Sequence, residues 1–573
     1  MNSLGPLDLL VVLGTLLGIT VLGGKLAGKQ HDVRDFFLGG RRLPWWAVAA
    51  SIVATEISAV TYVSLPSVVW RDGGDLTYLQ IALFGSLIAK AVVGFVLVPA
   101  YFEREIFSPY DYMGQRLGEG VRRTTTMLFS LGGVLAQAAR VYLVAVVLEV
   151  LMARELAWVN SVTGLSPLAA AVLLIGLVAI TWTLIGGIAA IVWTDALLFL
   201  LFLVGIAVLL FSATAEIDGG LMAALREGAA AGKLRVIDTT PTIAKPYTLW
   251  VALFAAPFML LGPYGTDQLI VQRLFACPNA REARKAMLAS YVAVLVTLAV
   301  GLVGVVLYAY LRQHPPGPEA AALLAEKPDR LLPVYVLTSL PDGLRGLVVA
   351  GVFAAAISSL DSILSALAQT SSALLLKPTT DPRRALRVSR ALVVGWGFVL
   401  CTVAILLAAV HDRYGSILDL ALAIATYTSG ALIAAFFLAF LPTGRDGRGL
   451  SWSACLSIAS VLVMAWPEPT HQSKVYLGMG VLCIAWLARR CLPVFRGKVP
   501  VGREFAASLW FILGLATVVL LARFGHSVGA DSDGLVSPRP IAYPWFVVVG
   551  TAVAFVFGFL LADRRSVDAS DQA

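Results

Sequence analysis

The chain has 573 residues, of which 59% are hydrophobic and only 14% are charged, and its mean hydropathy is +0.84. Soluble globular proteins average about 45–50% apolar and about 25% charged residues, so this composition excludes a set of soluble domains and indicates an integral membrane protein. The net charge of +8 does not indicate a nucleic-acid partner, because lysine and arginine lie in short loops between apolar segments, where membrane topology requires them.

Long apolar segments follow one another from near residue 7 to near residue 562. A membrane-spanning helix needs about 20 mostly apolar residues, and counting such segments predicts about fifteen spans. The residues between the fifth and sixth spans are compatible with a tight turn or with an uninterrupted helix. The first segment lacks a basic start and a cleavage site, so we interpret it as a span and not as a signal peptide. The approximate limits are 7–26, 45–70, 76–101, 124–153, 167–187, 190–214, 247–274, 286–311, 345–377, 388–411, 417–441, 451–466, 474–492, 506–523 and 543–562.

Lysine and arginine are concentrated in alternate loops between these spans. Such loops are expected to face the cytoplasm, because positive charge is retained on that side of a membrane. This places the N-terminus outside and the C-terminal tail in the cytoplasm, and it predicts a multi-pass protein of the cell membrane. The basic residues of these loops are Lys29, Arg34, Arg41, Arg42, Arg104, Arg116, Arg122, Arg123, Arg281, Arg284, Lys285, Lys377, Arg383, Arg384 and Arg387.

Two of the predicted spans carry residues that interrupt helices. The span at 45–70 contains many hydroxyls and Pro66, and the span at 247–274 contains Pro257 and the motif GPYG. Many transporters consist of two inverted repeats whose binding sites lie at interrupted helices in matching positions. The two interrupted spans are five spans apart and therefore run in opposite directions. This spacing predicts one repeat in spans two to six and a second, inverted repeat in spans seven to eleven.

A stripe of polar side chains runs along the apolar span at 345–377. Its members recur at the spacing that places residues on one face of a helix, while the opposite face is alanine, isoleucine and leucine. An ionisable group at bilayer depth usually marks an ion or substrate path, and hydroxyl and carboxylate oxygens suit a hard cation such as Na+. The alternative is that the hydroxyls bond to their own helix or join neighbouring helices. The members are Ser358, Asp361, Ser362, Ser365 and Gln369.

Two further charges inside predicted spans are candidates for a function. Asp195 either neutralises a second cation or pairs with a basic group. Arg140 is a candidate anchor for an anionic group of a substrate, because the planar guanidinium binds a carboxylate with two parallel hydrogen bonds. The alternative for Arg140 is a structural pair with Glu149 or another acid.

Motifs of enzymes are not found in this sequence. The five cysteines form no CxxC pair, and the five histidines lie in loops or at the ends of spans. Neither a disulfide framework nor a zinc site is therefore supported. No P-loop, nucleophile elbow or dinucleotide fingerprint occurs. We expect a protein that is not an enzyme.

Four sequence blocks, in this order and at this spacing, resemble the sodium/solute symporter family. The resemblance covers roughly residues 5–440 and implies an all-α integral membrane protein with a LeuT-like fold. That fold would consist of one leading helix at 1–44, a first five-helix repeat at 45–214, a loop at 215–246, a second inverted repeat at 247–441, and additional helices with a short tail at 442–573. The blocks are DFFLGGRRLPWWAVAASIVATEISAVTYVSLPS (35–67), WTLIGGIAAIVWTD (182–195), GTDQLIVQRLFAC (265–277) and LPDGLRGLVVAGVFAAAISSLDSILSA (340–366).

The resemblance also implies which residues bind ions and substrate. Departures from the family pattern are Leu198, where glutamine is frequent, and Pro263–Tyr264, where the sugar carriers have an aromatic pair. The main sodium site would use Ala54, Ile57, Ala355, Ser358 and Ser359. A second sodium site, found in some branches, would use Asp195, Ser358, Asp361 and Ser362. Substrate contacts would come from Ser58, Thr61, Gln80, Arg140 and Tyr264.

These observations together predict a sodium-coupled secondary active symporter that imports a small organic solute by alternating access. Its coupling ion would be Na+, its other partners the solute and membrane lipid, and the solute would be carboxylated or sugar-like. With Arg140, the chain resembles the branch of the family that handles carboxylated substrates. Two alternatives stay open: a proton-coupled transporter of the same fold, in which Asp361 or Asp195 titrates, and a membrane sensor that relies on a partner for signalling.

Overall fold

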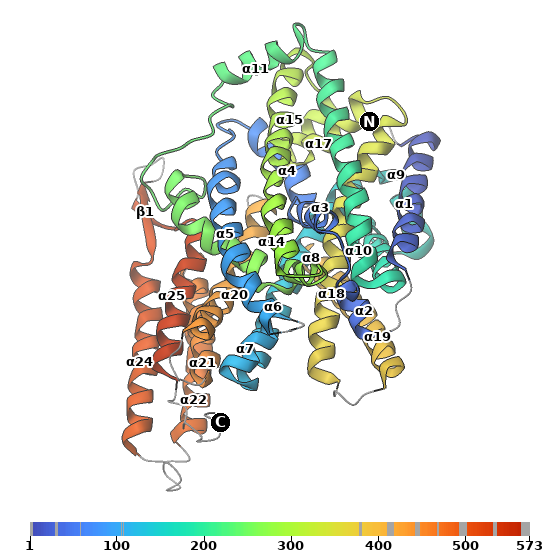
Figure 1. Cartoon of the computed structure of the whole chain (residues 1–573). Coiled ribbons are helices and arrows are strands. Elements are labelled where there is room, and N and C mark those ends of the chain that lie inside the picture. Colours follow the sequence, from blue (N-terminus) through green and yellow to red (C-terminus); the bar gives the residue numbers. More distant parts are fainter. Residues whose placement is uncertain are drawn as a thin grey trace. The chain divides into compact units, whose positions relative to one another are not determined.

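The computed structural model describes most of the chain, and most of the described residues are helical (Figure 1). A short antiparallel pair of strands, β1 (His526–Ala530) and β2 (Val536–Pro540), is also present among them. The expected all-α class is confirmed, with this strand pair as a small addition. The described residues are 4–28, 32–57, 59–104, 106, 108–376, 381–408, 417–441, 447–466, 469–491, 501–530 and 536–562.

The helices include many that are long and apolar enough to cross a bilayer. Within the described ranges there are eight such helices, and a bent pair of helices makes a ninth. Each predicted span overlaps a described helix, so the chain is a multi-pass membrane protein. Shorter apolar helices account for part of the remaining spans, at Val251–Thr266, Ala425–Phe440, Gly449–Ala465 and Pro544–Leu560.

The chain forms two compact units, each assembled from segments that are distant in sequence. Two helices, α8 (Glu119–Leu151) and α20 (Ile417–Phe440), contribute residues to both units. The boundaries of the units differ from those of the expected repeats, and the division into inverted repeats stays a prediction. Unit 1 comprises Met1–Phe107, Gly133–Asp238 and Gln268–Leu422, and unit 2 comprises Ser108–Gly132, Thr239–Asp267 and Ala423–Ala573.

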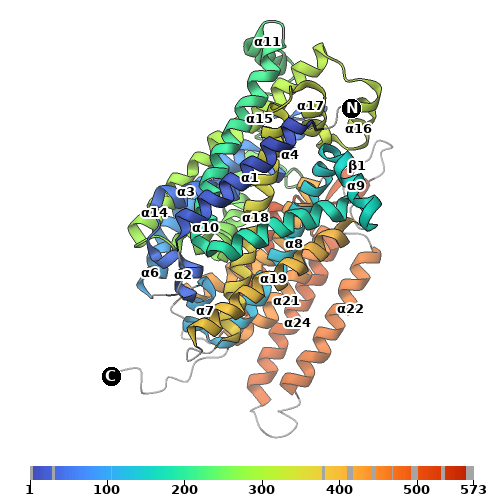
Figure 2. The same ribbon diagram turned by 90° about the vertical axis from the view of Figure 1, so that its right-hand side faces the viewer.

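Unit 1 is organised around its longest helix, α10 (Pro167–Ala215). This helix packs against α18, α1, α3 and α19, and Figure 2 shows α1 running alongside it. α10 is apolar on all sides, as expected of a helix surrounded by protein and lipid. The other elements of unit 1 are α1 (Pro6–Ala27), α2 (Val33–Leu38), η1 (Gly39–Arg41), α3 (Trp45–Glu56), α4 (Ala59–Trp70), η2 (Ile81–Gly85), α5 (Ser86–Val92), η3 (Val93–Leu97), α6 (Val98–Glu103), α9 (Ala153–Thr163), α11 (Gly220–Ala230), α13 (Gln268–Phe275), α14 (Ala280–Ala289), η6 (Ser290–Val292), α15 (Ala293–Gln313), α16 (Pro318–Glu326), η7 (Pro328–Arg330), α17 (Leu331–Ser339), α18 (Leu344–Leu375) and α19 (Pro382–Ala408).

Gly187 divides α10 into two spans. Its backbone has φ 55° and ψ −151°, which is not helical and which favours glycine. A Cβ atom at this position would lie 2.2 Å from the backbone oxygen of Phe36. The junction between the fifth and sixth predicted spans is therefore a break in the helical path, fixed by the close approach of α2, and it precedes Asp195 by about two turns.

The span predicted at 45–70 is broken, as expected. α3 ends at Glu56, and the helical segments on either side of the break differ in direction by 51°. Ile57, just after α3, has φ −84° and ψ 77°. Pro66 lies inside α4 and is not the cause of the break. The break thus occurs at a position without proline or glycine, which indicates that contacts with other helices hold it open.

The span predicted at 247–274 is also interrupted. Its first part consists of η4 (Val251–Ala255), α12 (Ala256–Leu261) and η5 (Gly262–Thr266), all in unit 2. Asp267 then has extended backbone, with φ −90° and ψ 130°. α13 begins at the next residue and belongs to unit 1. The two sides of this interruption therefore belong to different units.

Unit 2 is mainly a group of apolar helices at the C-terminal end of the chain. α21, α24 and α25 pack against one another (Figure 1). Gly430 of α20 and Gly550 of α25 allow close contact, since a Cβ on Gly430 would lie 2.8 Å from the carbonyl carbon of Gly550. α7 joins this group through Arg116, whose Nε donates to the carbonyl of Ala439 at 2.9 Å. The elements not yet given are α7 (Pro109–Leu117), α21 (Arg448–Ala465), α22 (Pro469–Trp486), η9 (Leu487–Cys491), α24 (Val501–Phe524) and α25 (Pro544–Leu560).

Candidate functional site

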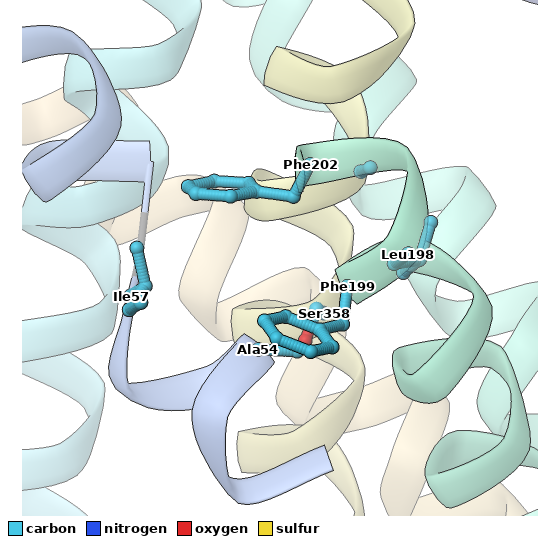
Figure 3. A pocket seen from close by; sticks show the side chains of 7 residues that line it. Ala54, Ile57, Leu198, Phe199, Phe202 and Ser358 are labelled. Carbon is cyan, nitrogen blue, oxygen red and sulfur yellow. The ribbon is translucent and has the colours of Figure 1, made fainter. Parts of the chain in front are cut away.

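A small cavity lies beside the break between α3 and α4, entirely within unit 1 (Figure 3). Its volume is about 10 Å³, which is room for about one water molecule or one small ion. The walls come from three elements: the end of α3, the second half of α10, and α18. The lining residues are Ala54, Ile57, Leu198, Phe199, Phe202, Ala354 and Ser358.

The cavity combines partial negative charge with apolar walls. The last four carbonyls of a helix have no partner within that helix and carry the negative end of its dipole. Ala54 and Ile57 occupy this position at the end of α3, and the N–H of Ile57 still bonds to the carbonyl of Val53 at 2.9 Å. Figure 3 shows the rings of Phe199 and Phe202 pointing from α10 toward the broken helix. The apolar rings exclude water, so electrostatic attraction for a cation is strengthened there.

A buried ionic cluster adjoins the cavity and shares Ser358 with it. Asp195 on α10 and Arg273 on α13 are both fully buried, and Nη2 of the guanidinium lies 2.9 Å from Oδ2 of the carboxylate. Ser51 of α3 donates its hydroxyl to the same oxygen at 2.5 Å. Ser358 of α18 donates its hydroxyl to the other oxygen, Oδ1, also at 2.5 Å. Four helices of unit 1 therefore meet at one carboxylate.

The guanidinium of Arg273 is held by several further partners. Its Nε donates to the hydroxyl oxygen of Ser51 at 2.7 Å, and its Nη1 donates to the carbonyl of Leu269 at 2.5 Å. Nη2 also donates to the hydroxyl oxygen of Ser362. The fork of the arginine thus reaches α3, α10, α13 and α18 at once, which the single ammonium of a lysine does not reproduce.

Asp361 is the second carboxyl group of this cluster. It is fully buried, and its Oδ1 lies 3.1 Å from the hydroxyl of Ser362. The hydroxyl of Ser362 also donates to the carbonyl of Ser358 at 2.5 Å. Among the described residues, Oδ2 of Asp361 has no hydrogen-bond partner. With both carboxyls ionised, two negative charges would face one guanidinium.

The polar stripe of α18 continues beyond the ionic cluster. Ser365 accepts a hydrogen bond from Nε2 of Gln272 at 2.9 Å, and Gln369 accepts one from Nε2 of Gln268 at 2.5 Å. Gln272 also donates to the carbonyl of Phe37 at 3.0 Å. The whole stripe is therefore buried against α10 and α13, and its serines do not face lipid.

Three of the five residues predicted for the main sodium site line this cavity. Ala54, Ile57 and Ser358 line the cavity. Ser359 is buried on α18 beside Ser358, and Ala355 lies one turn earlier on the same helix. The residues predicted for a second sodium site also come together, but Asp195 and Ser362 both bond to Arg273.

The residues predicted to contact substrate are distributed over both units. Thr61 is buried on α4, and Arg140 lies half-buried on α8, two residues before Tyr142, which packs with Val68 of α4. Tyr264 is buried in unit 2. Ser58 lies outside the described residues.

Gln80, the remaining predicted substrate residue, is fully buried at the start of η2. Its Nε2 donates to the carbonyl of Thr77 at 3.3 Å, and its Oε1 accepts from the backbone N–H of Asp238 at 3.2 Å. Asp238 lies in the loop after α11. Lys233 of the same loop donates to the carbonyls of Trp70 and Arg71, at the end of α4, at 3.0 and 2.5 Å. Burial lowers the pKa of Lys233.

Sequence reasoning missed Arg273, Ser51 and the pairing of Glu56 with Lys90. Arg273 stands at the end of a predicted span, where a basic residue normally marks the membrane boundary. The available signal was the pair Gln268 and Gln272, four residues apart, which places two polar side chains on one face of the same short helix. The ammonium of Lys90 lies 2.8 Å from Glu56, whose role was unclear from sequence.

Known proteins resemble this chain over most of its length. Residues 36–449 match the model of the sodium:solute symporter family. The chain is 27% identical to the human sodium/iodide cotransporter over 497 residues, which are 84% of this chain and 73% of that protein. It is 29% identical to the human sodium-coupled monocarboxylate transporter 1 over 443 residues, 76% of this chain and 69% of that protein.

A third relative and a solved structure extend the comparison. The rabbit (Oryctolagus cuniculus) sodium-dependent multivitamin transporter is 26% identical over 538 residues, 93% of this chain and 78% of that protein. The structure of a Na+-coupled sialic acid symporter, in a substrate-bound outward-open state, matches with a TM-score of 0.70 and 20% identity, covering 98% of this chain and 100% of that one. This match confirms the expected LeuT-like fold.

Proposed function

Because the chain belongs to the sodium:solute symporter family, we propose that it binds its coupling ion in the cavity beside the α3–α4 break. The protein is a sodium-coupled symporter of the membrane, which moves a small organic solute together with Na+ by alternating access. The residues proposed to surround the ion are Ala54, Ile57, Ala355, Ser358 and Ser359.

The observation that carries this proposal is the cavity itself. It lies at the C-terminal end of α3 beside Ser358 of α18, and it has room for about one small ion. Oxygen ligands of this kind suit a hard cation, and no soft ligand lines the cavity among the described residues. A Na+ ion placed here would replace its hydration water by oxygens from two helices and would thereby hold those helices together.

The position of the cavity also supports coupling between ion and solute. The residues proposed to contact solute begin directly after the break, at Ser58 and Thr61. An ion that orders the end of α3 therefore also orders the start of α4. By thermodynamic reciprocity, a solute that needs the ordered break raises the affinity for Na+ by the same factor as Na+ raises the affinity for solute. Separation of α3 from α18 would release both.

For the solute we propose a small organic molecule with a carboxylate, anchored by Arg140. A guanidinium in a half-buried position binds a carboxylate well, because its two parallel hydrogen bonds match the two oxygens. Several relatives of this chain are named for monocarboxylates or vitamins. A sugar-like solute is the alternative, in which Gln80 and Thr61 would supply polar contacts.

One structural alternative for Arg140 is disfavoured by the helix that carries it. Arg140 and Glu149 lie in the continuous helix α8. Nine residues correspond to about 13.5 Å along the axis and about 180° around it, so the two side chains leave opposite faces of the helix. A direct ion pair between them does not fit this geometry.

Uptake into proteoliposomes tests both parts of the proposal. We expect accumulation of a labelled carboxylate under an inward Na+ gradient and no accumulation when choline replaces Na+ at fixed pH. Arg140→Gln is expected to abolish uptake of the carboxylate, Arg140→Lys to retain part of it, and the control Glu149→Gln to retain all of it. Uptake driven by a pH gradient without Na+ would favour the proton-coupled alternative. Equal uptake by Arg140→Gln would contradict the carboxylate anchor.

The orientation of the chain is proposed from its charged loops. The N-terminus would lie outside and the C-terminal tail in the cytoplasm, because the loops rich in lysine and arginine are then cytoplasmic. Single cysteines introduced near residue 5 and near residue 565, in a chain without its own cysteines, would be labelled from opposite sides of intact cells or vesicles. Labelling of both from one side would refute the assignment.

A further inference from the structure

We infer that Asp195 and Arg273 act together as positioning residues for the Na+ site, by fixing the direction in which the hydroxyl hydrogen of Ser358 points. This inference rests on the proposed function, since it assumes that Ser358 faces Na+ in the cavity beside the break. It assigns a role to Arg273 and gives Asp195 a role other than that of a direct ligand.

A serine hydroxyl has one hydrogen and two lone pairs, and only the lone pairs bind a cation. The hydrogen must therefore point away from the ion. Within its own helix a serine usually donates this hydrogen to a backbone carbonyl one turn earlier. Ser358 instead donates to Oδ1 of Asp195 at 2.5 Å, and the same residue lines the cavity. With its hydrogen held by the carboxylate, Ser358 keeps both lone pairs for the cavity.

Asp195 serves this purpose because its other oxygen is already occupied. Oδ2 receives the hydroxyl of Ser51 at 2.5 Å and Nη2 of Arg273 at 2.9 Å, so Oδ1 remains for Ser358. A carboxylate accepts at both oxygens and offers no hydrogen of its own. With Oδ1 as the acceptor, the hydroxyl of Ser358 bonds to Asp195 as a donor.

Arg273 holds this carboxylate in place. Both groups are fully buried, and an isolated buried charge is costly unless a partner neutralises it. The guanidinium also bonds to Ser51, to Ser362 and to the carbonyl of Leu269, so its own position is fixed from three directions. The ion pair is therefore a rigid support behind the hydroxyl that faces the cavity.

The substitution Asp195→Asn separates this role from simple burial. An asparagine has one oxygen, and the guanidinium is the strongest donor that competes for it. The amide N–H₂ then occupies the place of Oδ1 and donates to Ser358, which turns the hydroxyl hydrogen toward the cavity. We expect the Na+ concentration that gives half-maximal uptake to rise by about tenfold or more. This rise corresponds to the loss of about one charge-assisted hydrogen bond. Maximal uptake at saturating Na+ is expected to change by less than about threefold.

A second substitution tests the direction of the hydroxyl. In Asp195→Asn with Arg273→Met the net charge of the pair is preserved and the competing guanidinium is absent. The amide oxygen is then free to turn toward Ser358, and we expect the Na+ dependence to recover most of the tenfold loss. Recovery is not expected of an ion pair that merely stabilises the fold, since its removal leaves the packing further from native.

Non-additivity gives an independent test. Ser358→Ala removes the hydroxyl on which Asp195 acts, so Asp195→Asn in that background is expected to change the Na+ dependence no further. Affinity is measured as the Na+-induced rise in melting temperature of the purified protein without solute, and as uptake in proteoliposomes. Asp75→Asn is the matched control, because Asp75 is a buried carboxylate paired with Arg235, away from the cavity.

The outcomes separate this inference from the proposed function. Wild-type protein that shows no response to Na+ would refute the proposed function, whatever the variants do. A wild-type response with an unchanged Na+ dependence in Asp195→Asn would refute the inference alone. Equal impairment of the single and the charge-preserving double variant, or additive effects with Ser358→Ala, would also refute it. If Asp195→Asn does not fold, comparison of the double variant with Ser358→Ala decides the question: similar Na+ affinities would overturn the inference, and higher affinity of the double variant would support it.

Discussion

Lys90 and Glu56 form an ion pair at the end of α3, and we expect the loss of each partner to have a different cost. The ammonium of Lys90 lies 2.8 Å from Glu56 and 2.9 Å from the carbonyl of Ser290. The side chain of Lys90 is 1% exposed, whereas that of Glu56 is 19% exposed. Glu56→Ala therefore leaves a charge that protein encloses fully, and Lys90→Met leaves a charge that protein encloses only in part.

The magnitudes follow from this difference in exposure. Breaking a buried ion pair by removing one partner costs about 3–5 kcal/mol when the remaining charge is fully buried, which applies to Glu56→Ala. A group that is only partly buried costs about 1–3 kcal/mol when it is left without its partner, which applies to Lys90→Met. The double variant leaves no stranded charge, and we expect it to be more stable than Glu56→Ala by about 2 kcal/mol or more.

Unfolding of the purified protein by heat and by denaturant measures these differences. The expected order of melting temperatures is wild type, then Lys90→Met, then Glu56→Ala, with the double variant above Glu56→Ala. Glu56 also precedes Ile57, which lines the cavity, so all three variants should show weaker Na+ binding in the same assay. A Lys90→Met protein as unstable as Glu56→Ala would refute the argument from exposure. Unchanged Na+ binding in all three would refute the link between this ion pair and the break.

Three further predictions concern the site and its supports. Ser359→Ala should abolish sodium-dependent uptake while the protein still inserts into the membrane. The control Thr402→Ala, on the exposed face of α19, should leave uptake unchanged. Normal sodium dependence of Ser359→Ala would contradict the assignment of Ser359 as a ligand. Gly187→Ala should lower the free energy of unfolding by more than about 2 kcal/mol, because φ is 55° and the added Cβ would lie 2.2 Å from a backbone oxygen. The control Gly14→Ala, whose Cβ would have no atom within 4 Å, should have little effect on the melting temperature. Phe199→Ala should enlarge the cavity, admit water and weaken the preference for Na+ over K+ in competition experiments; an unchanged preference would argue against this ring as part of the wall.

The periodic features of the sequence predicted the structure well. The stripe from Ser358 to Gln369 follows the helical repeat, and α18 buries all of its members as expected. The spans were predictable because each requires a long apolar segment, and hydropathy reports this directly. The turn at Gly187 was visible as a pair of glycines, although sequence alone did not distinguish a break from a continuous helix.

Features that depend on contacts between distant helices were less predictable. Local propensity favoured Pro66 as the interruption of its span, but α4 accommodates this proline and the chain breaks at Ile57. Neighbouring helices determine the position of that break, and Lys90 and Ser290 reach it from α5 and η6. The role of Arg273 was similarly not predictable, because a single sequence does not show that Asp195 lies beside it.

The size of the cavity at the break has a consequence for the choice among alkali metals. A cavity with room for about one water molecule does not admit a cation with its shell of water, so each ion must lose its water before it enters. The energy needed to strip it is largest for lithium and falls toward potassium, while the fit to a narrow ring of oxygens worsens in the same direction. A cavity of this size therefore favours an ion of intermediate radius. A more rigid aromatic wall would increase this selectivity without any new ligand.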